Sequence, residues 1–513
     1  MSRHDAVRVI AGSIVAVLAA GCTLGPDPER PVTAAEAGDA YVHAAEAGSP
    51  PPEVSPWWRE FGDHATVELV EAALVGNTDL RVMAARVLEA EAAFRRAGGA
   101  RLPQVTYGAT GSKQRVSFVL PEIGRRDIDS TTYSYSIGAS WQADLFGRLE
   151  RTQQSAWAGL LAEEWSHEAV VHAVVAGVVR ARVLVATAGR ALEINRQITA
   201  SWESTLRTVE RRYRAGLADA VELYLARENY SSAMASEAVI AGALEQARLA
   251  LDVLVGRRPG TGPSLPGTMP DLPSLEPVPL GLPAQLLDRR PDLKQAEMQL
   301  AAATYGVGAA LANLYPDLSL TASVGESGDR TADLDLENFV FNIVANLTGP
   351  LFSGGQRRAD VDAARARAEQ AAAAYAGEVL EALREVEGAL VAGEASSRNF
   401  EFTSERVAEA RAADSLAKER YQRGVGSLLT VLETERRLRL AEQAKITATS
   451  DLWNARIDLF LALGGDWGTD REASENPGKE TTVNSNDGDS VEASMKPEIP
   501  HSEFLIPNSP EVS

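Results

Sequence analysis

Four short sequence landmarks occur twice in this chain and in the same order. The first two are an aspartate and a proline 24 residues later, Asp79 and Pro103 in the first half and Asp292 and Pro316 in the second. The third matches Asp144-Leu145-Phe146-Gly147 with Pro350-Leu351-Phe352-Ser353-Gly354. The fourth matches Arg212-Tyr213-Arg214-Ala215-Gly216 with Arg420-Tyr421-Gln422-Arg423-Gly424. A repeated series of this kind constrains the fold more than length does, because each half must form the same supersecondary unit. We therefore predict a duplicated unit of about 200 residues.

Each half contains one very long segment without proline. These segments run for 68 residues from Leu145 to Arg212 and for 70 residues from Leu351 to Arg420. Their many alanines favour helix, and either helix would extend roughly 100 Å at 1.5 Å per residue. Taken alone, such helices are also typical of a coiled-coil rod.

Strand-like alternation interrupts the helical pattern twice in each half. The apolar members of the four runs are Val105, Tyr107 and Ala109; Tyr133, Tyr135, Ile137, Ala139 and Trp141; Leu318, Leu320, Ala322 and Val324; and Phe339, Phe341, Ile343, Ala345 and Leu347. Small or polar residues occupy most of the positions between them. Runs of about ten residues with one apolar and one polar face suit tilted strands that cross a membrane around water, although a soluble sheet with one buried face shows the same period. The two pairs of strands are separated by more than 150 residues of helix, which favours the membrane interpretation.

The first residues have the features of an export signal. A positive start at Arg3 and Arg8 precedes an apolar stretch, Val9 to Ala20, which is too short for a permanent membrane helix. It ends in Leu18-Ala19-Ala20-Gly21-Cys22, which resembles a bacterial lipobox, so residues 1–21 are predicted to be a lipoprotein signal peptide and Cys22 to be lipidated. An ordinary secretory signal followed by an incidental cysteine is the alternative. No later run of eighteen apolar residues was found, so we expect strands to make any membrane crossing.

Composition excludes several classes of function. With 71 acidic against 50 basic residues the net charge is −21, which argues against a nucleic-acid partner. One cysteine excludes a disulfide framework or a multi-cysteine zinc site, and His167 and His172 are five residues apart on different faces of a helix. The sequence contains no GxSxG elbow and no P-loop. We therefore expect neither an enzyme nor a resident metal.

The remaining segments define the predicted boundaries. An extended N-terminal segment (22–63) precedes the first repeat (64–256, with strands at about 103–143). A linker at 257–283 carries eight prolines, and the second repeat follows (284–465, with strands at about 316–350). Residues 466–513 hold eleven acidic and three basic residues and are predicted to be a disordered acidic tail.

The lipobox followed by Gly25-Pro26-Asp27-Pro28, together with the duplicated plan and the Arg-Tyr-x-x-Gly turns, resembles the TolC-like outer-membrane efflux factors of the lipoprotein NodT branch. The resemblance covers residues 22 to 465. It implies a mainly α fold with a membrane β-barrel, in which a helix–strand–strand–helix unit is duplicated. It also implies a homotrimer whose twelve strands form one barrel, continued by a long α-helical tunnel in the periplasm. The residues alone establish only that four strands cannot close a barrel, so any pore must be shared between chains.

The resemblance also implies a function. The protein would be the passive outer-membrane channel of a tripartite efflux pump, lipid-anchored in a Gram-negative bacterium and without a cofactor besides the diacylglycerol and N-acyl chain on Cys22. Its partners would be a periplasmic adaptor and an inner-membrane resistance–nodulation–division transporter, because no nucleotide site is present to supply energy. The exported cargo, drugs or metals among others, stays open. A periplasmic structural coiled-coil lipoprotein is the alternative.

Two groups of site residues follow from the resemblance. Adaptor contact is expected at Gly216, Leu217, Gly424, Val425 and Gly426. The pore constriction is expected at Glu433, Thr430 and Tyr421. A threefold ring of Glu433 carboxylates would attract cations, and mutual repulsion would raise the pKa of the ring. The alternative for Glu433 is an ordinary solvated charge on a helix face.

Overall fold

The structure is a computed structural model, which describes residues 23–37, 40–43, 56–59, 61–120, 124–263, 265, 283–329 and 339–465. All of these residues belong to one compact unit. The predicted signal peptide (1–21), Cys22, the acidic tail (466–513), part of the N-terminal segment and most of the proline-rich linker lie outside the described residues, and those predictions stay as they are.

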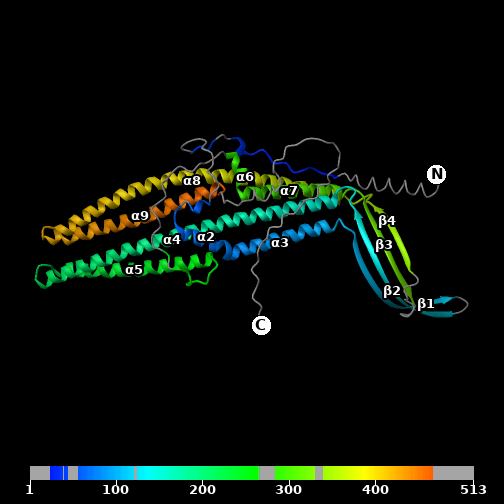
Figure 1. Ribbon diagram of the computed structural model, residues 1–513, viewed down its shortest axis with the longest axis horizontal. Helices are drawn as coiled ribbons and strands as arrows, with labels where there is room; N and C mark the ends of the chain where they lie inside the picture. Colours follow the sequence, from blue (N-terminus) through cyan, green and yellow to red (C-terminus); the bar gives the residue numbers. More distant parts are fainter. Residues whose placement is uncertain are drawn as a thin grey trace, which may run out of the picture. The chain divides into compact units, whose positions relative to one another are not determined.

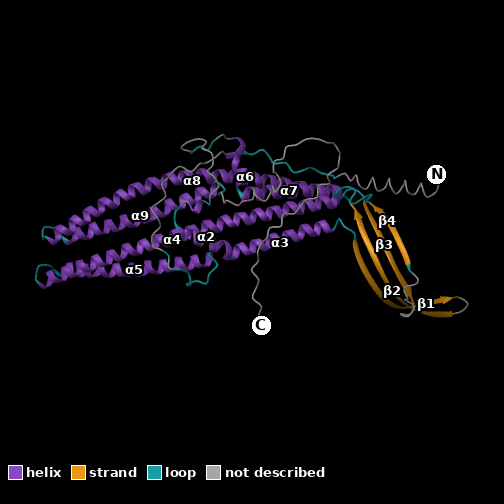
Figure 2. Ribbon diagram, in the orientation of Figure 1, coloured by secondary structure: helices purple, strands orange, loops and turns teal. Residues whose placement is uncertain are grey.

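Long helices and a four-stranded sheet make up the described unit (Figures 1 and 2). The helices are α2 (His64–Gly76), α3 (Thr78–Gly99), α4 (Arg148–Arg214), α5 (Ala220–Leu254), α6 (Leu286–Arg289), α7 (Pro291–Ala312), α8 (Gln356–Gln422) and α9 (Leu428–Ala462). The strands are β1 (Gln104–Leu120), β2 (Gly124–Ala143), β3 (Asp317–Gly328) and β4 (Val340–Thr348), and three short 3₁₀ turns lie at Ala34–Ala37, Trp57–Arg59 and Pro283–Gln285.

Corresponding helices of the two halves have equal lengths. Both α3 and α7 have 22 residues, α4 and α8 have 67, and α5 and α9 have 35. Each of the two 67-residue helices follows a glycine with positive φ, Gly147 at 73° and Gly355 at 86°. Glycine adopts this backbone without a Cβ clash, so the chain can turn from the preceding strand into the helix at these two points.

In each half, the residue before the 22-residue helix (α3 or α7) connects that helix to the end of the 35-residue helix (α5 or α9). Asn77 accepts from the backbone N–H groups of Asp79 and Leu80, which caps α3, and its amide donates to Leu254 O at 2.7 Å. In the second half, Arg290 precedes α7 and donates to Ala462 O at 3.0 Å. Different side chains thus make the same connection in the two halves.

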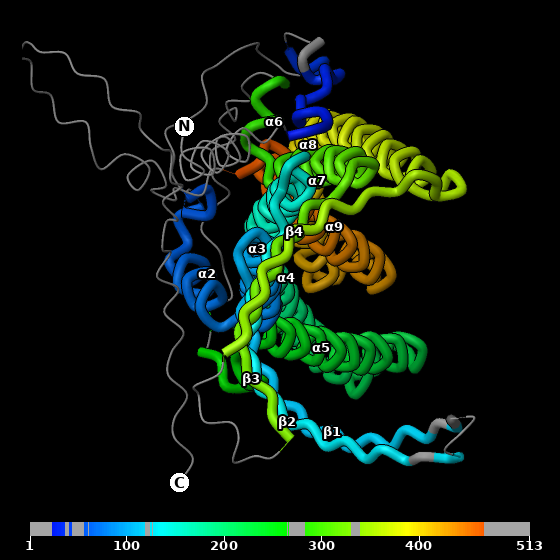
Figure 3. Tube along the Cα trace, turned by 90° about the vertical axis from the view of Figure 1, so that its right-hand side faces the viewer, coloured from blue at the N-terminus to red at the C-terminus, as the bar shows by residue number. Residues whose placement is uncertain are grey.

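The four strands form one antiparallel sheet in the order β1-β2-β3-β4. The register aligns Tyr107 with Ile137, Ile137 with Val324, and Val324 with Phe341, so these apolar residues share one face. The next row, Thr106, Gly138, Ser323 and Asn342, lies on the opposite, polar face. The described strands form a curved strip in Figure 3.

The strands of the first half are longer than the expected ten residues. β1 has 17 residues and β2 has 20, and beyond Tyr133 they pair only with each other. The expectation was wrong because the regular apolar alternation is interrupted where the ladder continues, in a mixed stretch where Val116 pairs with Ile128. Polar partners also face each other in this extension, as in the ion pair between Arg115 and Asp129 at 2.6 Å.

The main core lies around the middle of α4. Its buried valines, from Val174 to Val185, pack with α2 and α5, and with an aromatic group in which Phe61 lies 4.7 Å from Trp453 between ring centroids. By length and composition α4 contains a window that could cross a membrane, although no single run of eighteen apolar residues occurs in the sequence. Because 56% of that window is already buried in this core, we assign it to the helical packing.

Candidate functional site

The predicted adaptor-contact residues lie in two turns between long helices. At the α4–α5 turn Gly216 has φ of 69°, and the N–H of Leu217 donates to Arg212 O at 2.8 Å. This pattern is the Schellman motif, which closes a helix with a left-handed residue that is usually glycine. Asp219 then begins α5 by accepting from the N–H of Glu222 at 2.8 Å.

The α8–α9 turn repeats this geometry. Gly424 has φ of 77°, and Val425 N–H donates to Arg420 O at 3.0 Å. A Cβ on Gly426 would lie 3.0 Å from Tyr421 N, so this second glycine also permits a close approach of the chain. Both turns therefore have the same hydrogen-bonded shape.

The residue after the left-handed glycine is aliphatic and exposed in both turns. Leu217 is 68% exposed and Val425 is 67% exposed. The structure thus places equivalent side chains, at equivalent positions of two equivalent turns, where a partner could reach them.

Tyr421, a predicted constriction residue, joins the two turns instead of facing solvent. It is 5% exposed and belongs to a cluster that contains Val209 and Leu223 from the first hairpin and Leu428 from the second. The guanidinium of Arg212 lies 5.0 Å from the centre of its ring, within cation–π range. Burial raises the pKa of the Tyr421 phenol, and the nearby carboxylate of Glu222 acts in the same direction.

The other two constriction candidates lie on the first turns of α9, where Thr430 is exposed and Glu433 is half-buried. The carboxylate of Glu433 accepts from Arg436 at 3.0 Å and from Arg437 at 2.6 Å. These guanidinium groups lower the pKa of Glu433 to about 2. Thr430 belongs to the helix cap, because its N–H donates to Ser427 Oγ at 3.2 Å. Within one chain, Glu433 is thus a charge paired with arginines three and four residues further along α9.

The described chain begins directly after the predicted lipidation site, and its first residues are held firmly. We call Thr23–Asp27 the N-terminal strap. Arg151, which is 3% exposed, donates to Leu24 O at 3.0 Å, to Gly25 O at 3.2 Å and to Asp27 Oδ1 at 2.8 Å. The strap also passes Gly308 of α7 so closely that a Cβ there would lie 2.7 Å from Leu24 O.

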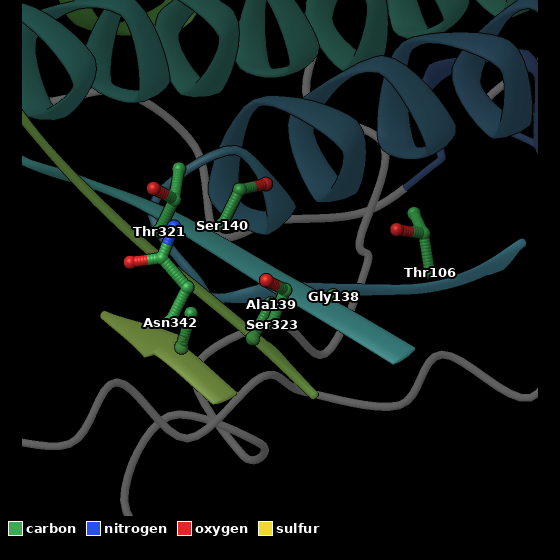
Figure 4. A pocket seen from close by; sticks show the side chains of 8 residues that line it. Thr106, Gly138, Ala139, Ser140, Thr321, Ser323 and Asn342 are labelled. Carbon is green, nitrogen blue, oxygen red and sulfur yellow. The ribbon is translucent and has the colours of Figure 1, made fainter. Parts of the chain in front are cut away.

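The polar face of the sheet is hollowed at its centre (Figure 4). Residues of all four strands line this depression, most of them from the polar rows of the sheet: Thr106, Gly138, Ala139, Ser140, Thr321, Ala322, Ser323 and Asn342. Small and hydroxylated side chains of this kind are typical of a surface that faces water. Across the described ranges, no three His, Cys, Asp or Glu side chains gather as a metal site would require.

Comparison with known proteins decides the family. The family model for outer membrane efflux proteins matches residues 69–257 and again residues 282–465. The chain belongs to the outer membrane efflux protein family. As a member it is an outer-membrane efflux channel of Gram-negative bacteria, which confirms the predicted function and the predicted outer-membrane location. The family consists of channels and not of enzymes.

Individual relatives match over nearly their whole length. The solvent efflux pump outer membrane protein SrpC of Pseudomonas putida is 32% identical over 87% of this chain and 96% of its own. The pyoverdine export outer membrane protein OpmQ of Pseudomonas aeruginosa is 32% identical over 89% of this chain and 96% of its own. Among solved structures, the outer-membrane channel OprN is 28% identical, with a TM-score of 0.77 over 87% of this chain and all of that one.

Sequence reasoning missed two features of this efflux protein. The arginines that pair with Glu433 follow it at the i+3 and i+4 spacing, which is a readable sign of contact on a helix face. By contrast, the strap contacts join Leu24 and Gly25 to Arg151 and Gly308. Partners more than 120 residues apart leave no local pattern, so the sequence offered no signal for them.

Proposed function

We propose that this efflux protein is a passive conduit in which three copies complete one barrel, and that its helices continue the passage through the periplasm. The observation that carries the proposal is the open four-stranded sheet, with an apolar face, a polar face and edges at β1 and β4. Within lipid, unpaired edge groups cost several kcal/mol each, so a membrane sheet must close. Because four strands cannot close alone, further copies must supply the rest.

The helices support the second part of the proposal. A 67-residue helix is roughly 100 Å long, far more than any bilayer requires. The two family matches and the equal helix lengths support an origin of both halves from one duplicated helix–strand–strand–helix unit. Three copies of two such halves would surround a passage with six similar units.

The two turns are the proposed contact with a periplasmic adaptor, through Gly216, Leu217, Gly424, Val425 and Gly426. An inner-membrane transporter of the resistance–nodulation–division class is the proposed source of energy. The relatives differ in cargo, since one is named for solvent efflux and another for pyoverdine export. We therefore assign the protein to the export of small molecules supplied by its transporter, which leaves drugs and metal ions as candidate cargo.

A lipid on Cys22 is the proposed anchor. The strap supports this proposal because Leu24 N–H donates to Phe146 O at 3.4 Å, three residues beyond the end of β2. A lipid on the residue just before the strap would start close to the strand ends from which the helices continue. An acyl chain placed there would enter the same membrane as the strands.

Disulfide cross-linking of the sheet edges tests the conduit. Thr106 on β1 and Asn342 on β4 lie in one row of the register but are separated by three strand spacings, or about 14 Å. That separation is too long for a disulfide within one chain. The double variant Thr106→Cys/Asn342→Cys should therefore form linked trimers under oxidation, whereas either single variant should not exceed a dimer.

Neighbouring subunits could pair in another register, so the experiment is repeated with Gly108→Cys or Thr110→Cys in place of Thr106→Cys. The cross-linked trimer should conduct in a planar bilayer. A chain that stays monomeric in every pair, and that forms no pore, would instead match the alternative of a structural coiled-coil lipoprotein.

A further inference from the structure

Two buried and two half-buried polar side chains meet between the two hairpins, above the turns. Ser201 comes from α4, Asp414 and Lys418 come from α8, and Glu435 comes from α9; we call them the buried polar cluster. Asp414 and Glu435 are only 6% and 4% exposed. The cluster lies about 12 Å above the α8–α9 turn, since Asp414 precedes the last residue of α8 by eight positions.

Lys418 holds the cluster together across both hairpins. Its ammonium donates to Ser201 Oγ at 2.9 Å, lies 2.9 Å from Asp414 Oδ2 and lies 3.7 Å from Glu435 Oε2. Ser201 belongs to the α4–α5 hairpin, whereas the charged members belong to the α8–α9 hairpin. The cluster is therefore a polar connection between the two hairpins, set among apolar contacts such as those of Trp202 and Leu432.

The cluster has one negative charge too many for a buried site. One ammonium faces two carboxylates, and it is close to Asp414 but distant from Glu435. Oδ1 of Asp414 and Oε2 of Glu435 are both buried without a hydrogen-bond partner. A buried carboxylate with incomplete pairing is costly, and binding a proton removes that cost.

We propose that the buried polar cluster is a proton-binding site on Glu435, and that loss of this proton loosens the packing between the two hairpins near the turns. The proposal rests on the proposed function only for its consequence, which is easier opening of the passage at higher pH. The packing change itself can be measured without any current.

The surroundings of Glu435 set the direction of the effect. Burial raises its pKa to about 7, and Asp414 adds to the rise, whereas Lys418, the Ser201 hydroxyl and Arg439 oppose it. If the hairpins separate and water reaches the carboxyl group, its pKa returns toward the ordinary 4.5. The packed state therefore holds the proton more tightly, so it loses stability as pH rises between about 4.5 and 7 and stays at that lower level above.

Distance measurement between the hairpins tests the proposal. Spin labels on Arg211→Cys in α4 and Gln422→Cys in α8, both exposed, would report the separation in the full-length protein. The parent protein, whose one cysteine is Cys22, is treated with the same label and serves as the blank. The wild-type distance should lengthen from pH 5.5 to pH 8. Glu435→Gln, which imitates the protonated state, should keep the short distance throughout.

The matched control is Glu442→Gln, a carboxylate seven residues further along α9 that pairs with Arg411. It should retain the wild-type pH profile. Two further variants should move the midpoint in opposite directions: Lys418→Met upward, because it removes the opposing positive charge, and Asp414→Asn downward, because it removes the neighbouring negative charge. These shifts serve as the test if Glu435→Gln fails to fold.

A wild-type distance that ignores pH, or a Glu435→Gln profile equal to the wild type, would overturn the proposal. Midpoints that fail to separate between Lys418→Met and Asp414→Asn would do the same. If the distances respond as expected but no variant conducts, the proton site stands and the conduit is the part that fails.

Discussion

Among single residues, Glu433 shows most clearly how neighbours decide the behaviour of a charge. A ring of carboxylates alone would repel itself and titrate upward, but Arg436 and Arg437 pair with this carboxylate within each chain. Since they lower its pKa to about 2, the charge should persist from pH 8 down to pH 4. Cation-to-anion permeability should therefore change little over that range in the wild-type channel.

The double variant Arg436→Gln/Arg437→Gln should behave differently. Without the guanidinium groups the channel should prefer cations more strongly at neutral pH, because two positive charges per chain are gone. This preference should weaken as pH falls toward the ordinary carboxyl range, where Glu433 becomes protonated. Reversal potentials in planar bilayers measure both effects. Arg398→Gln, an exposed arginine on α8 paired with Glu394, is the control, and a double variant with unchanged permeability would return Glu433 to an ordinary surface charge.

Among the elements, strand β2 allows a direct test of which face meets lipid. Ile137 lies in the apolar row with Val324, and Ser136 lies on the other face opposite Gly325. A lysine at Ile137 should destabilise the inserted state by about 2–4 kcal/mol if the position lies near the midplane, whereas Ser136→Lys should mainly alter conductance. Denaturant unfolding of the reconstituted protein gives the free energies, and equal losses at the two positions would contradict a lipid-facing Ile137.

The same strands show how far a sequence carries. Alternation predicted that Tyr135 and Ile137 share a face, because period two follows directly from the pleat. It did not predict the outer half of the β1–β2 hairpin, where polar pairs such as Arg115 and Asp129 interrupt the apolar alternation. Likewise, glycine and the absence of proline predicted the long helices and their turns, but the burial of Tyr421 depends on contacts between two hairpins and has no local signature.

On the scale of the whole molecule, the strap connects the N-terminus to both halves, through Arg151 in α4 and Gly308 in α7. Gly308→Ala should release it, because the new Cβ would lie 2.7 Å from Leu24 O and 3.0 Å from Arg151 side-chain atoms. Gly306→Ala is the matched control two residues away, since its Cβ would meet nothing within 4 Å. Released residues become accessible to protease, because local unfolding exposes the backbone.

Acyl labelling makes the release measurable. Wild-type protein labelled with palmitate should lose its label slowly to a glutamate-specific protease that cuts after Glu29, which is exposed next to the strap. Gly308→Ala should lose the label several-fold faster, whereas Gly306→Ala should match the wild type. Cys22→Ser should carry no label at all, and label on this variant would refute lipidation. Equal rates of label loss for the two alanine variants would refute the role of the strap. Because the proposed membrane strands would hold the protein in the membrane without the lipid, the cleaved wild-type channel should remain there after the lipid has left.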